Sequence, residues 1–178
     1  CYKVPMSSLQ IEVNDHTDVS LLEASAFSVK AEAGGLHGVG VHDHPGTGHD
    51  VFIRLAKMTE DTSHITLFPS VTNPITRHPT SIAASANSLG ELFPGRIRIM
   101  MGSGDQATSY IGRRAATVAQ MREAALAIRA LTHGGSVTID GRQVRAFQRE
   151  VVEPPDLFIN ASSPRMLACA GETADGAY

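Results

Sequence analysis

The chain has 178 residues, of which 42% are hydrophobic and 19% charged, enough for one globular domain with a sizeable core. The net charge of −3 and the scattered lysines and arginines argue against a nucleic-acid binder, and no apolar run approaches the ~20 residues needed to span a membrane. Two cysteines, Cys1 and Cys169, cannot make a disulfide framework, so we expect a reducing, cytoplasmic compartment. Because the first residue is Cys1 and not methionine, we expect a piece of a longer polypeptide.

The first half of the chain alternates short apolar runs with segments of helical periodicity. Pro5 lies within Lys3–Val13, which therefore makes at most a weak strand. A helix is predicted to start at an Asp18 cap, and its predicted buried stripe follows a spacing of four, three and four residues. That stripe consists of Leu22, Ala26, Val29 and Ala33. The next predicted elements are a strand at Val39–Val41, a helix at Val51–Glu60 and a strand at Ile65–Phe68, which Pro69 terminates.

The second half continues this alternation. Pro79 suits the first turn of a helix, and Asp140-Gly141 is a typical turn of a β-hairpin. The predicted elements are a helix from Pro79 with Ile82, Ala86, Leu89 and Phe93 on its apolar face, a strand at Ile97–Met101, a helix presenting Val118, Met121, Ala125, Ile128 and Leu131, a hairpin of Ser136–Ile139 and Val144–Phe147, a strand at Leu157–Ile159, a helix at Pro164–Ala170 and the start of a strand at Ala177-Tyr178.

This order predicts an α/β fold with a parallel sheet covered by helices. Repeating units of roughly 25–35 residues suit either a (β/α)8 barrel or a doubly wound sheet, and the periodicity does not choose between them. Both folds place their sites at the carboxyl ends of the strands. Polar clusters follow the predicted strands at these ends, so we expect a site there.

The first cluster is His42-Asp43-His44. In an extended strand His42 and His44 point the same way, so they could bind a metal; a polar strand end and an acid–base or hydrogen-bonding role for His44 are the other readings. A second cluster, Gly102–Asp105, is similar to phosphate-binding turns. It lacks their third glycine, since position 107 is alanine, and Asp105 disfavours a pyrophosphate.

Two further clusters follow later strands. Phe68–Pro74 could turn its backbone toward a ligand or could simply end a strand. In Asn160–Pro164, Ser162 or Ser163 is a natural helix cap, and the same N–H groups could bind an anion. Cys169 falls inside an apolar helix, where we expect a buried and inert thiol.

Several of these segments carry a resemblance to a known family. Val71–Pro79 is its most specific part, with the sequence VTNPITRHP, and Leu89–Arg96, Gly102–Asp105, Ala161–Leu167 and Ala170–Gly176 follow in the same order. Over roughly residues 19–178 the chain resembles the luciferase-like monooxygenase superfamily, in particular its deazaflavin-dependent, methylenetetrahydromethanopterin reductase-like branch. Gly40 stands where relatives often have a bulky residue, and Ser163 where they often have glycine.

The resemblance implies a luciferase-like (β/α)8 TIM barrel, of which residues 1–178 are one domain, incomplete at its C-terminus, with about the first five to six β/α units. It implies an oxidoreductase that transfers a hydride between reduced coenzyme F420, a deazaflavin, and a small organic substrate. An FMN-dependent monooxygenase using oxygen and a non-catalytic flavin-binding remnant are the alternatives, and a metal-dependent hydrolase using His42 and His44 is the weakest. An open sheet edge near Tyr178 implies a homodimer or the rest of a longer chain as partner.

The resemblance also implies roles for single residues. Asp43 and His44 would be catalytic, with His44 as proton donor or hydrogen-bond partner of the cofactor. The Ser70-Val71 peptide bond would be cis and would support the cofactor ring. The implied cofactor-binding residues are Ser70, Val71, Thr72, Asn73, Gly102, Gly104, Asp105, Ala161, Ser162 and Ser163.

Overall fold

A computed structural model describes residues 10–15, 19–46, 48–146 and 153–178. Cys1, Asp18, Phe147 and most of the weak first strand predicted at Lys3–Val13 lie outside the described residues. None of the helices in the described part of the chain has the length and apolarity that a membrane crossing requires.

A parallel sheet runs through the molecule with its strands in chain order. Two parallel bridges, Leu67 with Ile97 and Thr72 with Met101, connect its two three-stranded parts. A doubly wound sheet reverses its order part-way, so this continuous order favours the barrel type of arrangement. Over the described residues the sheet is open and does not close into a barrel. Its strands are β1 (Glu12–Asn14), β2 (Gly38–Val41), β3 (Thr66–Pro69), β4 (Arg98–Met101), β7 (Asp156–Ile159) and β8 (Gly176–Ala177).

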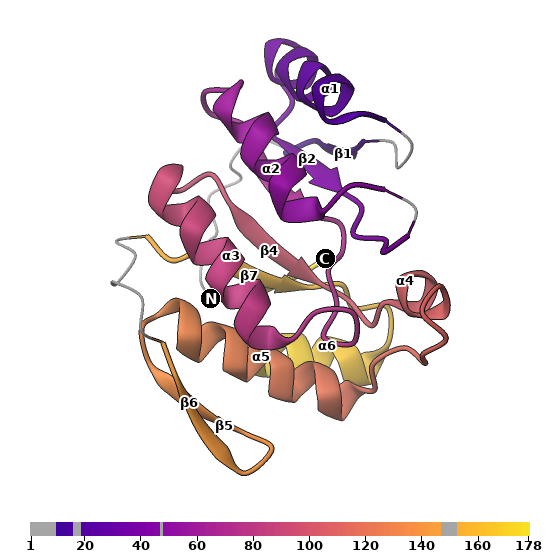
Figure 1. Ribbon diagram of the computed structural model, residues 1–178, viewed down its shortest axis with the longest axis vertical. Helices are drawn as coiled ribbons and strands as arrows, with labels where there is room; N and C mark the ends of the chain where they lie inside the picture. The colour runs from indigo at the N-terminus through magenta and orange to yellow at the C-terminus, as the bar shows by residue number, and fades with distance from the viewer. Residues whose placement is uncertain (1–9, 16–18, 47, 147–152) are drawn as a thin grey trace, which may run out of the picture.

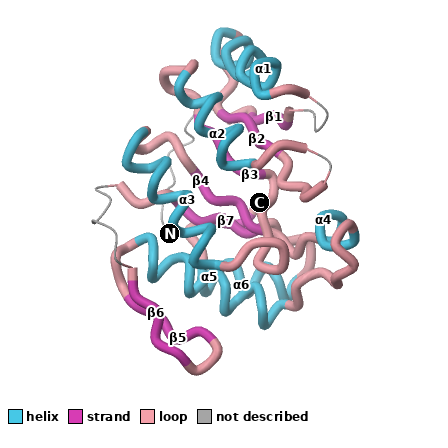
Figure 2. Tube along the Cα trace, in the orientation of Figure 1, coloured by secondary structure: helices cyan, strands magenta, loops and turns pink. Residues whose placement is uncertain are grey.

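The long helices cover one face of this sheet (Figure 1; Figure 2). Alternate strand residues, such as Val39, Leu67 and Ile99, form the core with Ile82 and Ile128 of the helices. The β5–β6 hairpin (Ser136–Ile139 and Arg142–Arg145) projects from the body, and its Asp140-Gly141 turn is as predicted (Figure 1). The helices are α1 (Leu21–Ala33), α2 (Val51–Glu60), α3 (Pro79–Leu92), α4 (Asp105–Ser109), α5 (Val118–Thr132) and α6 (Pro164–Thr173).

The other face of the sheet carries a second packed layer. The ring of Phe68, 1% exposed, lies against β2, where a Cβ on Gly40 would come within 2.8 Å of it. This contact explains why no bulky residue stands at Gly40. The Arg98 guanidinium lies over the rings of Phe68 and Phe158, 5.2 and 4.6 Å from their centroids, and 2.9 Å from Glu12 Oε1.

The buried face predicted for α1 is wrong. All four predicted positions (Leu22, Ala26, Val29 and Ala33) are exposed, with Leu22 at 71%. The helix is capped by Ser20, whose hydroxyl accepts from Glu23 N while Glu23 accepts from Ser20 N. The buried face consists of the small residues Ala24, Ser25, Ser28 and Ala31, and it lies against α2, so packing selects small side chains here rather than large ones.

Two smaller differences concern β3 and α4. Pro69 is the last residue of β3 instead of the residue that ends it. Helix α4 was not predicted, and its five residues are too few to display a helical period.

Candidate functional site

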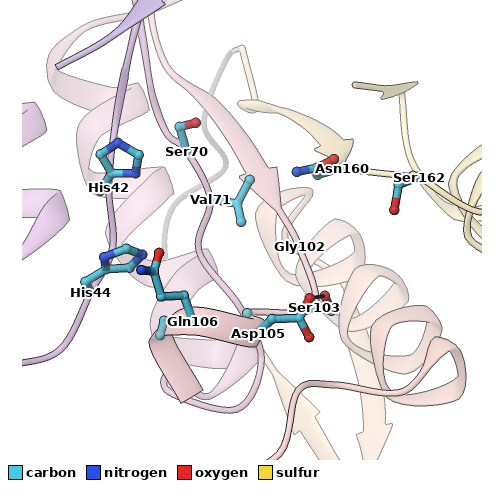
Figure 3. Close-up of a pocket in the computed structure, with 12 residues that line it drawn as sticks. His42, His44, Ser70, Val71, Gly102, Ser103, Asp105, Gln106, Asn160 and Ser162 are labelled. Carbon is cyan, nitrogen blue, oxygen red and sulfur yellow. Dashed lines mark hydrogen bonds between the residues drawn. The ribbon is translucent and has the colours of Figure 1, made fainter. Parts of the chain in front are cut away.

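A pocket of about 280 Å³ opens at the carboxyl ends of β2, β3, β4 and β7 (Figure 3). Each of these strands is followed by a segment that contributes to its lining, as the parallel arrangement predicts. The lining residues are His42, His44, Ser70, Val71, Gly102, Ser103, Gly104, Asp105, Gln106, Ala107, Asn160 and Ser162.

The floor of the pocket is formed where β3 leads into the end of β4. The peptide bond between Ser70 and Val71 is cis, as the resemblance implies. Beyond it, Thr72 N donates to Met100 O at 3.0 Å and Gly102 N donates to Thr72 O at 2.9 Å. A Cβ on Gly102 would come within 2.6 Å of Val71 Cγ2, so the glycine leaves the space that Val71 occupies.

Two histidines face the pocket from the segment after β2. The ring centroids of His42 and His44 are 5.5 Å apart, and that of His44 is 6.3 Å from Tyr110, which follows α4. Burial and the nearby His42 lower the pKa of His44, while the Asp43 carboxylate opposes them. His44 is therefore mainly neutral near pH 7, in the form that can accept a proton or a hydrogen bond.

We expect the pKa of His44, followed by NMR of its imidazole C–H signals, to lie below the ordinary value of about 6.5. His42→Gln removes the imidazole whose electrostatic effect lowers the pKa of His44, so it should raise that pKa. The folded state resists protonation of His44, so the free energy of unfolding should fall as pH drops from about 6.5 through the lowered pKa. An unchanged His44 pKa in His42→Gln would contradict this electrostatic coupling.

Asp43, predicted as catalytic, does not line the pocket. Its buried carboxylate faces away and accepts from Thr72 Oγ1 at 2.8 Å and from Arg77 Nε and Nη2 at 2.7 and 3.0 Å. Neighbouring residues of an extended chain point to opposite sides, so Asp43 cannot share the direction of His42 and His44. Asp43 therefore lies behind the pocket lining, and its predicted catalytic role stays a prediction.

The other predicted residues divide into two groups. Thr72 and Asn73 are fully buried behind the lining, and Asn73 Oδ1 accepts from Ile75 N at 3.1 Å and Thr76 N at 2.9 Å. Ala161 and Ser163 also lie outside the lining, and Ser163 caps α6. The predicted residues that do meet in the pocket are His44, Ser70, Val71, Gly102, Gly104, Asp105 and Ser162.

Gln106 and Ala107 complete the lining without having been predicted. Both belong to α4, and Figure 3 shows the Gln106 side chain extending toward His44. Among the residues that the structure describes, no three histidine, cysteine, aspartate or glutamate side chains come together as a metal site.

Comparison with known proteins identifies the family. The family described as luciferase-like monooxygenase matches residues 6–178. The chain belongs to the luciferase-like monooxygenase family. It is 32% identical over 164 residues to the 5,10-methylenetetrahydromethanopterin reductase of Methanolobus tindarius, covering 88% of this chain and 49% of that protein. It is 31% identical over 168 residues to the F420-dependent hydroxymycolic acid dehydrogenase of Mycobacterium tuberculosis, covering 85% and 47%.

Solved structures share the fold of this luciferase-like chain. The coenzyme F420-dependent tetrahydromethanopterin reductase of Methanopyrus kandleri superimposes with a TM-score of 0.84 at 23% identity, covering 96% of this chain and 55% of that one. An FMN complex of a type II Baeyer-Villiger monooxygenase from Pseudomonas putida gives 0.75 at 14% identity, covering 96% and 57%. The chain spans about half the length of the curated relatives it matches.

Proposed function

We propose that this chain forms the part of an F420-dependent oxidoreductase that holds the coenzyme ring and acts on a small organic substrate. The observation that carries the proposal is the pocket floor, where Val71 packs against Gly102 and His44 lines the same pocket. Relatives named as F420-dependent enzymes support the choice of coenzyme. FMN is the second candidate, because a monooxygenase of similar fold contains it.

The pocket could receive a flat ring system against Val71 and the backbone of Gly102 and Gly104. Val71 and Asn73 fill the positions where the Cβ atoms of these glycines would lie, so the two glycines allow this packed floor. The coenzyme, when bound, supplies the hydride chemistry. Val71 and Gly102 would hold the ring, Asn160 would offer hydrogen bonds to a polar ring edge, and neutral His44 would accept or return the proton at its imidazole nitrogen.

The proposal includes a complete (β/α)8 barrel as the setting of the site. Six parallel strands in chain order, with the long helices on one face, are what the first part of such a barrel requires. In a complete barrel of this kind, loops outside the present residues would also shape the substrate pocket. We therefore propose the substrate only as a small organic molecule.

The test is a fluorescence titration of the folded 178-residue chain with oxidised coenzyme F420 and, separately, with FMN. Tighter binding of F420 supports the proposed function. Tighter binding of FMN favours the monooxygenase alternative. Binding of neither by a chain with a cooperative thermal transition would overturn the proposal that this chain holds the ring.

We expect Gly102→Val to weaken coenzyme binding, because Val71, which lines the pocket, would have to move. The new Cβ would lie 2.6 Å from Val71 Cγ2, and such overpacking also lowers the free energy of unfolding by about 1–3 kcal/mol in the free chain. Gly171→Ala is the control, because a Cβ there meets nothing within 4 Å. Equal affinities of the two folded variants in the same titration would exclude Gly102 from the ring site.

A further inference from the structure

The connection between β2 and α2 carries both histidines of the pocket, and one guanidinium binds its two ends. Arg77 Nε and Nη2 donate to the two carboxylate oxygens of Asp43 at 2.7 and 3.0 Å. Arg77 Nη2 also donates to Asp50 Oδ2 at 2.9 Å. Asp43 stands at the start of this connection and Asp50 at its end, with His44 between them, so Arg77 restrains the segment from both sides.

Arg77 is itself well anchored. Its backbone N donates to Asn73 O at 3.3 Å, and it precedes His78, the N-cap of α3. Its guanidinium lies over the Phe52 ring at 5.4 Å from the centroid, and its side chain is 23% exposed. A planar group held by a ring and two carboxylates has little freedom to reorient, unlike a flexible ammonium.

The direction of the histidines follows from the direction of Asp43. The Asp43 side chain is almost fully buried and also accepts from Thr72 Oγ1 at 2.8 Å, which ties it to the chain just after Val71. With Asp43 held to one side, the alternation of an extended chain turns His42 and His44 to the other, toward the pocket.

We propose that Arg77 is a positioning residue that, by binding Asp43 and Asp50 together, holds the imidazoles of His42 and His44 against the pocket. Arg77 does not line the pocket itself. The inference concerns the arrangement of the chain's own residues, so it stands or falls independently of which coenzyme binds.

The test replaces the planar guanidinium of Arg77 by an ammonium group. Arg77→Lys keeps the charge but cannot bind three carboxylate oxygens in one plane. We expect the nuclear Overhauser contact between the His42 and His44 rings, 5.5 Å apart by their centroids, to be lost, and the imidazole signals of both residues to shift. The thermal midpoint, measured in parallel, reports the general loss of stability.

Arg98→Lys is the matched control, because Arg98 also pairs with a carboxylate at low exposure but lies at the first residue of β4, the strand end opposite the pocket. It should lower the thermal midpoint without moving the two imidazole signals. If Arg77→Lys lowers the midpoint and leaves the ring contact and signals as in the parent chain, the proposal is wrong.

A second variant keeps the test decisive if Arg77→Lys does not fold. Asp50 caps α2 by accepting from Phe52 N and Ile53 N, and Asp50→Ser keeps a good cap while its side chain is too short to reach Arg77. We expect a folded protein with the same shifts at His44 in smaller degree. Unchanged His44 signals in Asp50→Ser would contradict the restraint from the α2 end.

Discussion

Replacing Arg54 with methionine should lower the free energy of unfolding by about 3–5 kcal/mol. Arg54 Nη2 lies 2.5 Å from Asp15 Oδ2, and both side chains are 1% exposed. Methionine fills much of the volume but removes the guanidinium from a carboxylate that stays buried. The Asp15 backbone N donates to Gly40 O of β2 at 3.0 Å, which holds the chain against the sheet at this position.

Urea denaturation followed by circular dichroism measures this loss. Lys57→Met is the control on the same helix: Lys57 pairs with Glu60 and Asp61 at 3.1 and 2.9 Å, but its side chain is 32% exposed, so we expect a much smaller loss than for Arg54→Met. Adding Asp15→Asn to Arg54→Met should recover part of the stability, because it removes the buried charge that has lost its Arg54 guanidinium. Similar losses for Arg54→Met and Lys57→Met would refute a special role for the buried pair.

The helices that could be predicted are those whose large side chains face the sheet. In α3 the apolar spacing selects Ile82 and Leu89, and in α5 it selects Met121 and Ile128; all four are buried. Here the apolar stripe and the packed stripe are the same residues, so periodicity alone is sufficient. The predicted start of α3 at Pro79 is confirmed.

Helix α1 breaks that agreement. Its buried face contains Ser25 and Ser28, whose hydroxyls find partners inside: Ser28 Oγ donates to Ser25 O at 2.7 Å and Ser25 Oγ donates to Asp61. A polar residue that satisfies its own hydrogen bonds can be buried, and a hydrophobicity pattern does not contain that information. The larger Leu22 and Val29 consequently appear on the exposed side.

The site was predictable in its location more than in its detail. The rule that parallel strands share a carboxyl edge brings together Ser70, Gly102 and Ser162 from three different strand ends. The same reasoning about alternation that pairs His42 with His44 already implies that Asp43 faces away, whereas the resemblance placed Asp43 in the chemistry. Gln106 could not be found, because its place depends on the short helix α4.

The position of α4 itself depends on Gly104, and Gly104→Ala should lower the free energy of unfolding by about 3 kcal/mol. Gly104 has φ +82°, where a side chain costs about 1–2 kcal/mol. A Cβ there would also lie 2.5 Å from Asn73 Cγ, and such overpacking costs about 1–3 kcal/mol more. Asn73 cannot swing aside without releasing the hydrogen bonds that it accepts from Ile75 N and Thr76 N.

Gly112→Ala separates the two causes, because Gly112 has φ +67° but a Cβ there meets nothing within 4 Å. Gly112→Ala should lower the free energy of unfolding only by the cost of the left-handed backbone, about 1–2 kcal/mol. The difference between the two variants in urea denaturation therefore measures the cost of the contact with Asn73. Equal losses of stability in the two variants would mean that the Asn73 side chain moves aside at no cost.

Gly104 is the N-cap of α4, so the new methyl group would displace this helix and with it Gln106 of the pocket lining. Coenzyme affinity should therefore fall in Gly104→Ala but not in Gly112→Ala.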